Sequence, residues 1–235
     1  MRHGHVDYFA PGITDPRIVP LTDEGVEQAQ AARDALRNAH FDIAVYSGLP
    51  RTRQTAEIVL AGNEAPPELL AHSGLEEIKS GWIKAVSREE LAARLAFSFD
   101  GAEVPGASFL PDGETFEYAQ SRIIAALEEL VLESNWRSAL VVAHEGVNRI
   151  ALGWACGGGL STISAFDQDL ACINLIDIDV TPTSDGKGLQ IERMAIKALN
   201  MTVYDFVKKG LSRSSLEHLF DVDFGGLRPR IDPRG

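Results

Sequence analysis

The chain has 235 residues, of which 45% are hydrophobic and 24% charged, and this composition excludes a disordered, collagen-like or low-complexity protein. The formal net charge of −12 repels phosphate backbones, and no local basic patch offsets it, so we expect no nucleic-acid partner. No apolar run approaches the roughly 20 residues that cross a bilayer, which argues against a membrane protein. An anionic ligand would therefore need its positive charge concentrated in one pocket.

Hydrophobic periodicity divides the chain into helices that alternate with short apolar strands. Thr22 is a good N-cap, because Asp23 and Glu24 in the following turn complement the helix dipole. In chain order, the predicted elements are a helix over residues 23–37, a strand over 41–46, helices over 51–60 and from 87 onward, a helix over 114–133, a strand over 139–143, a helix from 145 that stops at the glycines 157–159, and strands over 171–180 and 189–199.

This alternation predicts an α/β fold, a three-layer α/β/α sandwich with a mostly parallel sheet and helices on both faces. We expect a single domain over residues 1–210, in which residues 83–111 form a helical insertion that covers the sheet's edge as a lid. The C-terminal tail over residues 211–235 is rich in glycine and proline near its end, and we expect it to be loosely ordered.

Two cysteines, Cys156 and Cys172, are too few for a disulfide scaffold and lack the paired spacing of a zinc or redox site. We expect two buried thiols in a reducing compartment. Polar residues follow Met1 at once, unlike a secretory signal, so the cytoplasm is the expected location.

Polar side chains that can bind phosphate follow the apolar runs. Ser47 and His144 each follow a predicted strand, Arg51 begins the next helix, and Arg2 and His3 stand at the start of the chain. Ligands of open α/β sheets bind in the crevice at the carboxyl ends of the strands, so we expect these side chains to share a site. Taken singly, each arginine would be a solvated surface residue and each histidine a hydrogen-bonded polar one. Together, two arginines and two histidines make a pocket for a dianion.

Short sequence blocks follow one another in a fixed order along most of the chain. They are Arg2-His3-Gly4; Leu21-Thr22 with Gly25 and Gln28-Ala29; Ser47-Gly48-Leu49-Pro50-Arg51-Thr52-Arg53-Gln54-Thr55-Ala56; Leu75-Glu76-Glu77-Ile78-Lys79-Ser80-Gly81-Trp82; Pro111-Asp112-Gly113-Glu114-Thr115 with Arg122; Val141-Val142-Ala143-His144-Glu145-Gly146-Val147; and Leu199-Asn200. In this order they resemble the signature of the histidine phosphatase superfamily, in its phosphoglycerate mutase-like branch. Arg-His-Gly alone is a weak signal, whereas the blocks in register are a specific one.

The resemblance implies the phosphoglycerate mutase-like fold and a phosphatase that hydrolyses a small phosphomonoester. His3 would be the nucleophile, attacking phosphorus through a neutral ring nitrogen to form a phosphohistidine. Arg2, Arg51 and His144 would hold the phosphoryl oxygens, where negative charge lies in the transition state.

The resemblance also implies an acid–base residue. Glu77 would protonate the leaving oxygen and then activate the water that hydrolyses the intermediate, with its neighbour Glu76 as the competing choice. Because two arginines and two histidines can neutralise the phosphate, no metal ion and no other cofactor is expected. The expected partner is a small phosphorylated metabolite, and the sequence leaves a homodimer open.

The sequence departs from the branch pattern in three places. Val6 and then residues 7–9 stand where many relatives have Thr or Ser and often Asn, so the substrate's identity stays open. Glu145 replaces a more common glycine, and its carboxylate could repel a highly anionic substrate. The apolar strand expected before Arg2 is missing, from which we expect the true start to lie upstream. An arginine held only by a frayed terminus would be poorly positioned and would bind phosphate weakly.

Three other functions stay open. On the same fold, a phosphoglycerate mutase would return the phosphoryl group to a bound sugar acid, but it needs further cations. Residues 79–94 offer only four basic residues among apolar and acidic ones. A metal-dependent hydrolase would use His3 and His5 as ligands, but it leaves Arg51 unused. An inactive phosphate-binding module would keep the fold, and the intact set of catalytic residue types argues against it.

Overall fold

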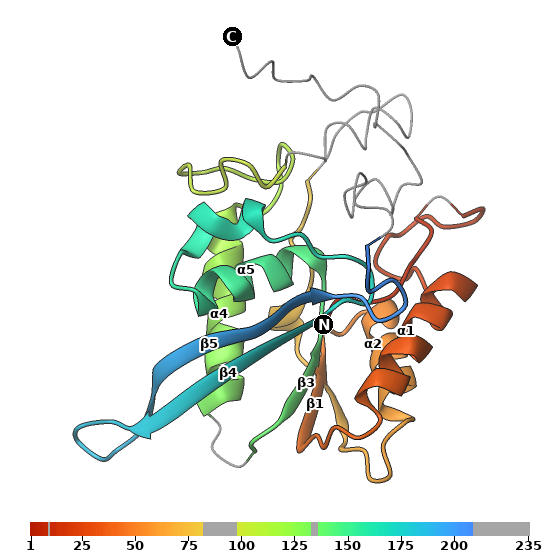
Figure 1. Ribbon diagram of the computed structural model, residues 1–235. Coiled ribbons are helices and arrows are strands. Elements are labelled where there is room, and N and C mark those ends of the chain that lie inside the picture. Colours follow the sequence, from red (N-terminus) through yellow and green to blue (C-terminus); the bar gives the residue numbers. More distant parts are fainter. Residues whose placement is uncertain (9, 82–97, 133–135, 209–235) are drawn as a thin grey trace, which may run out of the picture.

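A computed structural model of the chain describes residues 1–8, 10–81, 98–132 and 136–208. Helices lie on both sides of a central group of strands (Figure 1). The elements in chain order are α1 (Asp23–Leu36), β1 (Ile43–Tyr46), α2 (Pro50–Leu60), β2 (Leu69–Ala71), the short 3₁₀ helix η1 (Ser73–Leu75), α4 (Phe116–Leu132), β3 (Ala139–Val142), α5 (Glu145–Ala155), the 3₁₀ helix η2 (Gly159–Ala165), β4 (Ile173–Pro182) and β5 (Leu189–Met201).

The middle of the sheet is parallel. β1 pairs with β2 on one side and with β3 on the other, so that Ala44 lies opposite both Leu69 and Leu140. β4 and β5 form a long antiparallel hairpin whose turn projects away from the helices (Figure 1). The sheet thus has the parallel centre that the α/β pattern predicts.

The first residues of the chain extend this sheet beyond β3. His3 N–H donates to Ala143 O and Arg2 N–H donates to Cys172 O, each at 3.1 Å, and Arg2 forms a parallel bridge with Ala143. Backbone bonds on two sides therefore hold Arg2. The expectation that this arginine would be poorly positioned without a preceding apolar strand is wrong.

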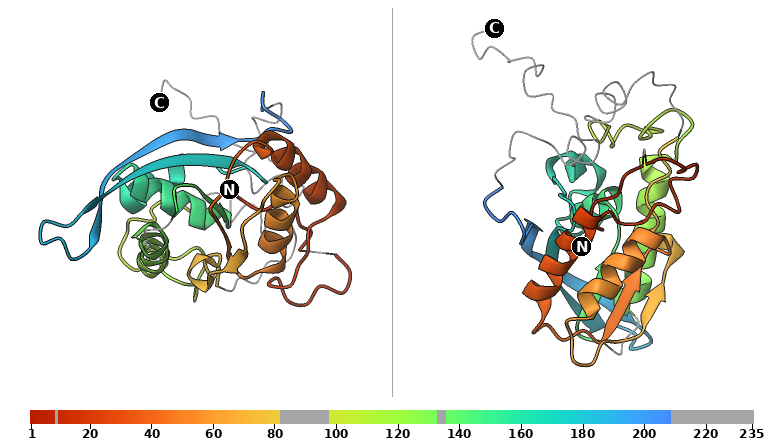
Figure 2. Two further views of the ribbon diagram at one scale, coloured as in Figure 1. Left: turned by 90° about the horizontal axis from the view of Figure 1, so that it is seen from below. Right: turned by 90° about the vertical axis from the view of Figure 1, so that its right-hand side faces the viewer.

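Alternate residues of the central strands face opposite sides, which makes the sheet a middle layer. Ala44, Leu140 and Val142 pack into one buried core with α1 and α2, whereas Val45 and Ala143 pack into a second core with α4 and α5. Seen from below, the N-terminus lies between the two pairs of helices (Figure 2). The predicted three-layer sandwich is confirmed.

Most predicted elements begin and end within two residues of the observed ones. α2 begins one residue early, at Pro50, because proline is favoured in the first helical turn. α5 ends just before Gly157, whose φ of +73° is the left-handed conformation of a helix stop. The three-residue strand β2 was not predicted, since it is too short to show a period. The prediction of two buried thiols is correct for Cys172 and wrong for Cys156, which is exposed.

Of the predicted insertion over residues 83–111, the structure describes residues 98–111. Phe99 in this part is buried, and its ring centroid lies 5.1 Å from that of Phe109 and 6.0 Å from that of Phe116 on α4. The helix predicted from residue 87 and the tail over residues 211–235 fall outside the described residues. Within the described ranges, no helix has both the length and the apolar character needed to span a membrane.

Candidate active site

Four of the predicted site residues meet where β1, β3 and the first residues of the chain end. Arg51 lies in the first turn of α2 after β1, and His144 caps α5 after β3. The rings of His3 and His144 are 5.2 Å apart between centroids, at an interplanar angle of 67°. Arg2, His3, Arg51 and His144 are each at most 4% exposed. The structure therefore places two guanidinium groups and two imidazoles in one buried cluster.

His3 is held in one tautomer by its own turn. Its Nδ1 lies 2.7 Å from Gly4 O, and a carbonyl oxygen only accepts, so Nδ1 carries the hydrogen and Nε2 keeps its lone pair. Burial, followed by the charges of Arg51 and Arg2, lowers the pKa of His3 well below its ordinary value of 6.5. The imidazole is therefore neutral near pH 7, and Nε2 is available as a nucleophile.

Two glycines bring this turn against α1. A Cβ on Gly4 would lie 2.4 Å from Gly25 O, and a Cβ on Gly25 would lie 2.2 Å from His5 O. Gly4 N–H also donates to Thr55 Oγ1 on α2 at 3.2 Å. Only the absence of both side chains allows the approach that fixes the histidine beside the two helices.

His144 is oriented by a chain of hydroxyl groups. Thr52 Oγ1 donates to Leu49 O at 2.8 Å, which uses its single hydrogen, so the Ser47 hydroxyl must donate to Thr52 across 2.9 Å. Ser47 Oγ then accepts from His144 Nε2–H at 2.7 Å. Burial, followed by the charge of Arg51, lowers the pKa of His144 well below its ordinary value. In the neutral ring Nδ1 consequently carries a lone pair, and only the protonated ring has an N–H there.

The cluster contains buried nitrogens that no group in the described part of the chain satisfies. Within the described residues, Arg2 Nε, Arg51 Nε and His144 Nδ1 have no hydrogen-bond partner. An unsatisfied buried polar group costs about 1–3 kcal/mol, so the two arginine N–H groups indicate a site for a ligand with acceptor oxygens, to which His144 Nδ1 can donate once it is protonated. A tetrahedral oxyanion beside His3 is such a ligand.

Of the two candidate acids, Glu77 lies at the cluster and Glu76 does not. Glu77 Oε1 accepts from Ile78 N–H at 2.9 Å, and Oε2 accepts from Gly146 N–H in the first turn of α5 at 3.3 Å. Burial raises the pKa of Glu77. Glu76 instead forms a two-point ion pair with the exposed Arg17, at 2.9 and 3.1 Å. The geometry supports Glu77 over Glu76.

Two features of the site were missed or misread in the sequence. The ring of Tyr8 lies 5.7 Å from the Arg51 guanidinium carbon, and burial raises the pKa of the Tyr8 phenol. Glu145, expected to repel anions, lies 3.0 Å from Arg2 Nη1 and also accepts from Arg149, so two cations compensate its charge. In the sequence, the signal for the contact between Glu145 and Arg149 was their spacing of four residues on one helix.

His3 and His5, the candidate ligands of a metal-dependent hydrolase, make hydrogen bonds to protein groups. His5 Nδ1 bonds to Thr22 Oγ1 at 2.8 Å, whereas His3 Nδ1 bonds to Gly4 O. Among the described residues, no group of three or more histidine, cysteine, aspartate or glutamate side chains is placed to hold a metal ion.

Comparisons with known proteins identify the family of the chain. The family model of the histidine phosphatase superfamily (branch 1) matches residues 1–184. The adenosylcobalamin/alpha-ribazole phosphatase of Salmonella typhimurium is 27% identical over 180 residues, which cover 76% of this chain and 88% of that protein. The metal-independent phosphoserine phosphatase of Arabidopsis thaliana is 30% identical over 158 residues, covering 63% of this chain and 64% of that protein.

A solved structure shows the same fold. The alpha-ribazole phosphatase of Shigella flexneri superposes with a TM-score of 0.64 at 23% identity, covering 85% of this chain and 94% of that one. The fold, the order of the sequence blocks and the matching family model lead to one conclusion: the chain belongs to branch 1 of the histidine phosphatase superfamily.

Proposed function

We propose that the protein is a metal-independent phosphatase that hydrolyses a small phosphomonoester through a phosphohistidine on His3. The observation that carries the proposal is the arrangement of nitrogens around this histidine. Nε2 of His3 keeps its lone pair, and Arg2, Arg51 and His144 each contribute a buried nitrogen that has no partner among the described residues. These groups suit the oxygens of a phosphoryl group that is transferred to His3.

In the first step, His3 Nε2 attacks phosphorus. A P–N bond forms while the P–O bond to the leaving group breaks, and protonated Glu77 gives its proton to the leaving oxygen. In the second step, the Glu77 carboxylate takes a proton from water as the water oxygen attacks phosphorus. The P–N bond breaks, inorganic phosphate leaves, and both residues return to their starting forms.

The environment of Glu77 supports this double role. Burial raises the pKa of its carboxyl, which favours the protonated form that the first step needs. The N–H groups of Ile78 and Gly146 donate to the two carboxylate oxygens, which favours the ionised form that the second step needs. Opposing influences of this kind keep both protonation states accessible during one catalytic cycle.

The substrate class follows from the relatives and from the charges at the site. The named relatives act as phosphatases of alpha-ribazole and phosphoserine compounds, so α-ribazole phosphate, phosphoserine and the general substrate p-nitrophenyl phosphate are the compounds to test first. Glu77 and Glu145 lie beside Arg2 and partly offset the cationic groups, which favours an ester with one phosphate.

The test is phosphate release from these esters by the wild type and by His3→Ala, with and without a chelator. We expect release that is insensitive to the chelator and is abolished in the variant. Isomerisation of 3-phosphoglycerate is measured in parallel. Fast isomerisation with little phosphate release would replace the phosphatase by a mutase, and chelator-sensitive release that survives in His3→Ala would overturn the proposal.

A further inference from the structure

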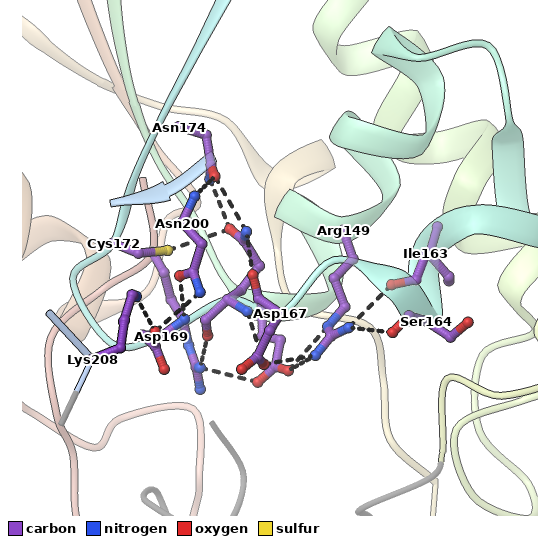
Figure 3. A network of polar contacts seen from close by, with 12 residues as sticks. Arg149, Ile163, Ser164, Asp167, Asp169, Cys172, Asn174, Asn200 and Lys208 are labelled. Atoms are coloured by element: carbon purple, nitrogen blue, oxygen red, sulfur yellow. Dashed lines mark hydrogen bonds and ion pairs between the residues drawn. The ribbon is translucent and has the colours of Figure 1, made fainter. Parts of the chain in front are cut away.

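A row of alternating charges, buried except at its Asp167 end, connects Arg2 to α5 and to the end of η2. Glu145 Oε2 lies 3.0 Å from Arg2 Nη1, and Glu145 Oε1 accepts from Arg149 Nε at 3.0 Å and Nη2 at 2.8 Å. Arg149 continues the row to Asp167 Oδ1 at 3.3 Å (Figure 3). Arg2, Glu145 and Arg149 are 2%, 4% and 7% exposed. The row holds two guanidinium groups and two carboxylates, so its formal charges cancel.

Arg149 has little freedom within this row. Its Nη1 donates to the carbonyl of Ile163 at 3.1 Å, at the end of η2 (Figure 3). Its guanidinium carbon lies 4.5 Å from the centre of the Phe99 ring. Glu145 is the first residue of α5, and the i,i+4 spacing brings Arg149 back over it. The Glu145 carboxylate is therefore held in place before any ligand arrives.

The same end of the Arg2 guanidinium is held from a second direction. Nη1 donates to the backbone carbonyl of Gln168. Gln168 is fully buried, and its side chain is tied to Asn174, whose Nδ2 donates to Gln168 Oε1 at 2.7 Å. Two fixed acceptors thus engage Nη1, whereas the buried Nε of Arg2 has no partner in the described part of the chain. This division leaves Nε for the phosphoryl group.

Glu145 also lies close to the proposed acid. Glu77 accepts from the N–H of Gly146, the residue after Glu145. After burial, the negative charge of Glu145 raises the pKa of Glu77, while the charge of Arg2 lowers it. Among the described residues, the charged and titratable groups that face Glu145 include Arg2, Arg149, Glu77 and Tyr8. Loss of the Glu145 charge would therefore act on Arg2 and on Glu77 together.

We infer that Glu145 is a positioning residue, which with Arg149 orients Arg2 for phosphoryl transfer and compensates its charge so that inorganic phosphate is released readily. The inference rests on the proposed phosphatase function. It explains why a carboxylate is placed against a phosphate-binding arginine: the arginine is oriented at the cost of some affinity for the anionic product.

Glu145→Gln is the sharpest test, because it removes the charge and keeps the shape. We expect kcat to fall on the order of tenfold to a hundredfold, as misplaced catalytic groups do. We expect inorganic phosphate to bind more tightly, because Arg2 loses a competing anion. The basic limb of the pH–rate profile, which reports ionisation of Glu77, should move to lower pH. Asp179→Asn, which removes an exposed ion pair with Arg193 on the hairpin, should leave all three quantities unchanged.

Arg149 supplies a second variant in case Glu145→Gln folds poorly. Arg149→Lys keeps the charge but loses the two-point contact, and we expect a smaller loss of kcat in the same direction, with Arg149→Met more severe. A merely structural role would lower the melting temperature and kcat together without tightening phosphate binding. Unchanged kcat, or weaker phosphate binding, in folded Glu145→Gln would overturn the inference.

Calorimetric titration with inorganic phosphate separates this inference from the proposed function, because it needs no turnover. If the wild type hydrolyses no ester, the proposed function fails. Tighter phosphate binding in Glu145→Gln would then still support the charge compensation of Arg2, whereas unchanged or weaker binding would remove it.

Discussion

Ser47 Oγ lies 2.7 Å from His144 Nε2, and this contact determines which nitrogen of the histidine faces the proposed phosphate site. The hydroxyl of Thr52, which donates to a backbone carbonyl, forces Ser47 to accept from the ring. Nδ1 of His144 is therefore left for the proposed ligand, and the orientation of this ring depends on the hydroxyl groups of Ser47 and Thr52.

Removal of this support should impair catalysis. In Ser47→Ala, the buried Nε2–H of His144 loses its acceptor, and either tautomer becomes accessible. We expect kcat/KM to fall by about tenfold and the free energy of unfolding to fall by about 1–3 kcal/mol. Thr52→Ser keeps the hydroxyl and should keep the wild-type kcat/KM, although it removes a buried methyl group. A Ser47→Ala enzyme with wild-type kcat/KM would show that the tautomer does not matter.

Phosphate binding should take up a proton at His144. The pKa of the free ring is lowered well below 6.5, so Nδ1 is unprotonated near neutral pH, while a bound phosphate oxygen requires an N–H there. Binding raises the pKa, so affinity is lost as the pH rises through the pKa of the complex. Calorimetry at about pH 8 in buffers of different ionisation enthalpy measures the uptake. His144→Asn, which offers an amide N–H without titrating, should bind phosphate without proton uptake, and uptake that persists in it would contradict the assignment.

The two buried histidines should make stability depend on pH. Their pKa values are lowered in the folded protein, so the unfolded chain binds protons more readily. Their contribution is fully present above the unfolded value of about 6.5 and is lost progressively as the pH falls below it. The melting temperature should therefore drop between about pH 7 and pH 5. His144→Asn should show a shallower drop, and an equally steep one would assign the dependence to other groups.

The proposed acid can be identified through leaving groups. Glu77→Gln should lower kcat about 10²- to 10⁴-fold for an alkyl phosphate, whose leaving oxygen needs a proton, and much less for p-nitrophenyl phosphate. Glu76→Gln, which only breaks the exposed pair with Arg17, should change kcat little for either ester. The opposite ranking of the two variants would transfer the role to Glu76.

The close approach at Gly4 should be intolerant of substitution. Because a Cβ there would lie 2.4 Å from a backbone oxygen, Gly4→Ala must displace the turn that carries His3. We expect a loss of about 1–3 kcal/mol in unfolding free energy, together with a loss of activity. Gly188→Ala, where the nearest atom would be 3.8 Å away, is the matched control and should be neutral. Equal stability of the two variants would refute the packing argument.

Much of the fold follows from local patterns. The period of the apolar residues and the caps predict α1, α2, α4 and α5, and the continuous apolar run predicts β3. Strand-end placement also predicts that Arg51 and His144 share an edge, because parallel strands end on the same side. The role of Glu77 came from the resemblance, since no local pattern separates it from Glu76.

Other features depend on contacts between distant segments. Arg2 is held by Ala143, by Cys172 and by the carbonyl of Gln168, and no local pattern at the start of the chain predicts these partners. The compensation of Glu145 by Arg2 likewise needs the fold to bury both groups together. Such tertiary contacts are what sequence reasoning about single segments omits.

The most direct test of the proposed mechanism is to locate the phosphoryl group on the protein during turnover. Rapid quenching with a radiolabelled ester should trap a base-stable, acid-labile label that maps to the peptide containing His3 and that forms and decays at least as fast as kcat. His3→Ala should carry no label. A label on another residue, or undiminished hydrolysis by His3→Ala, would contradict the account.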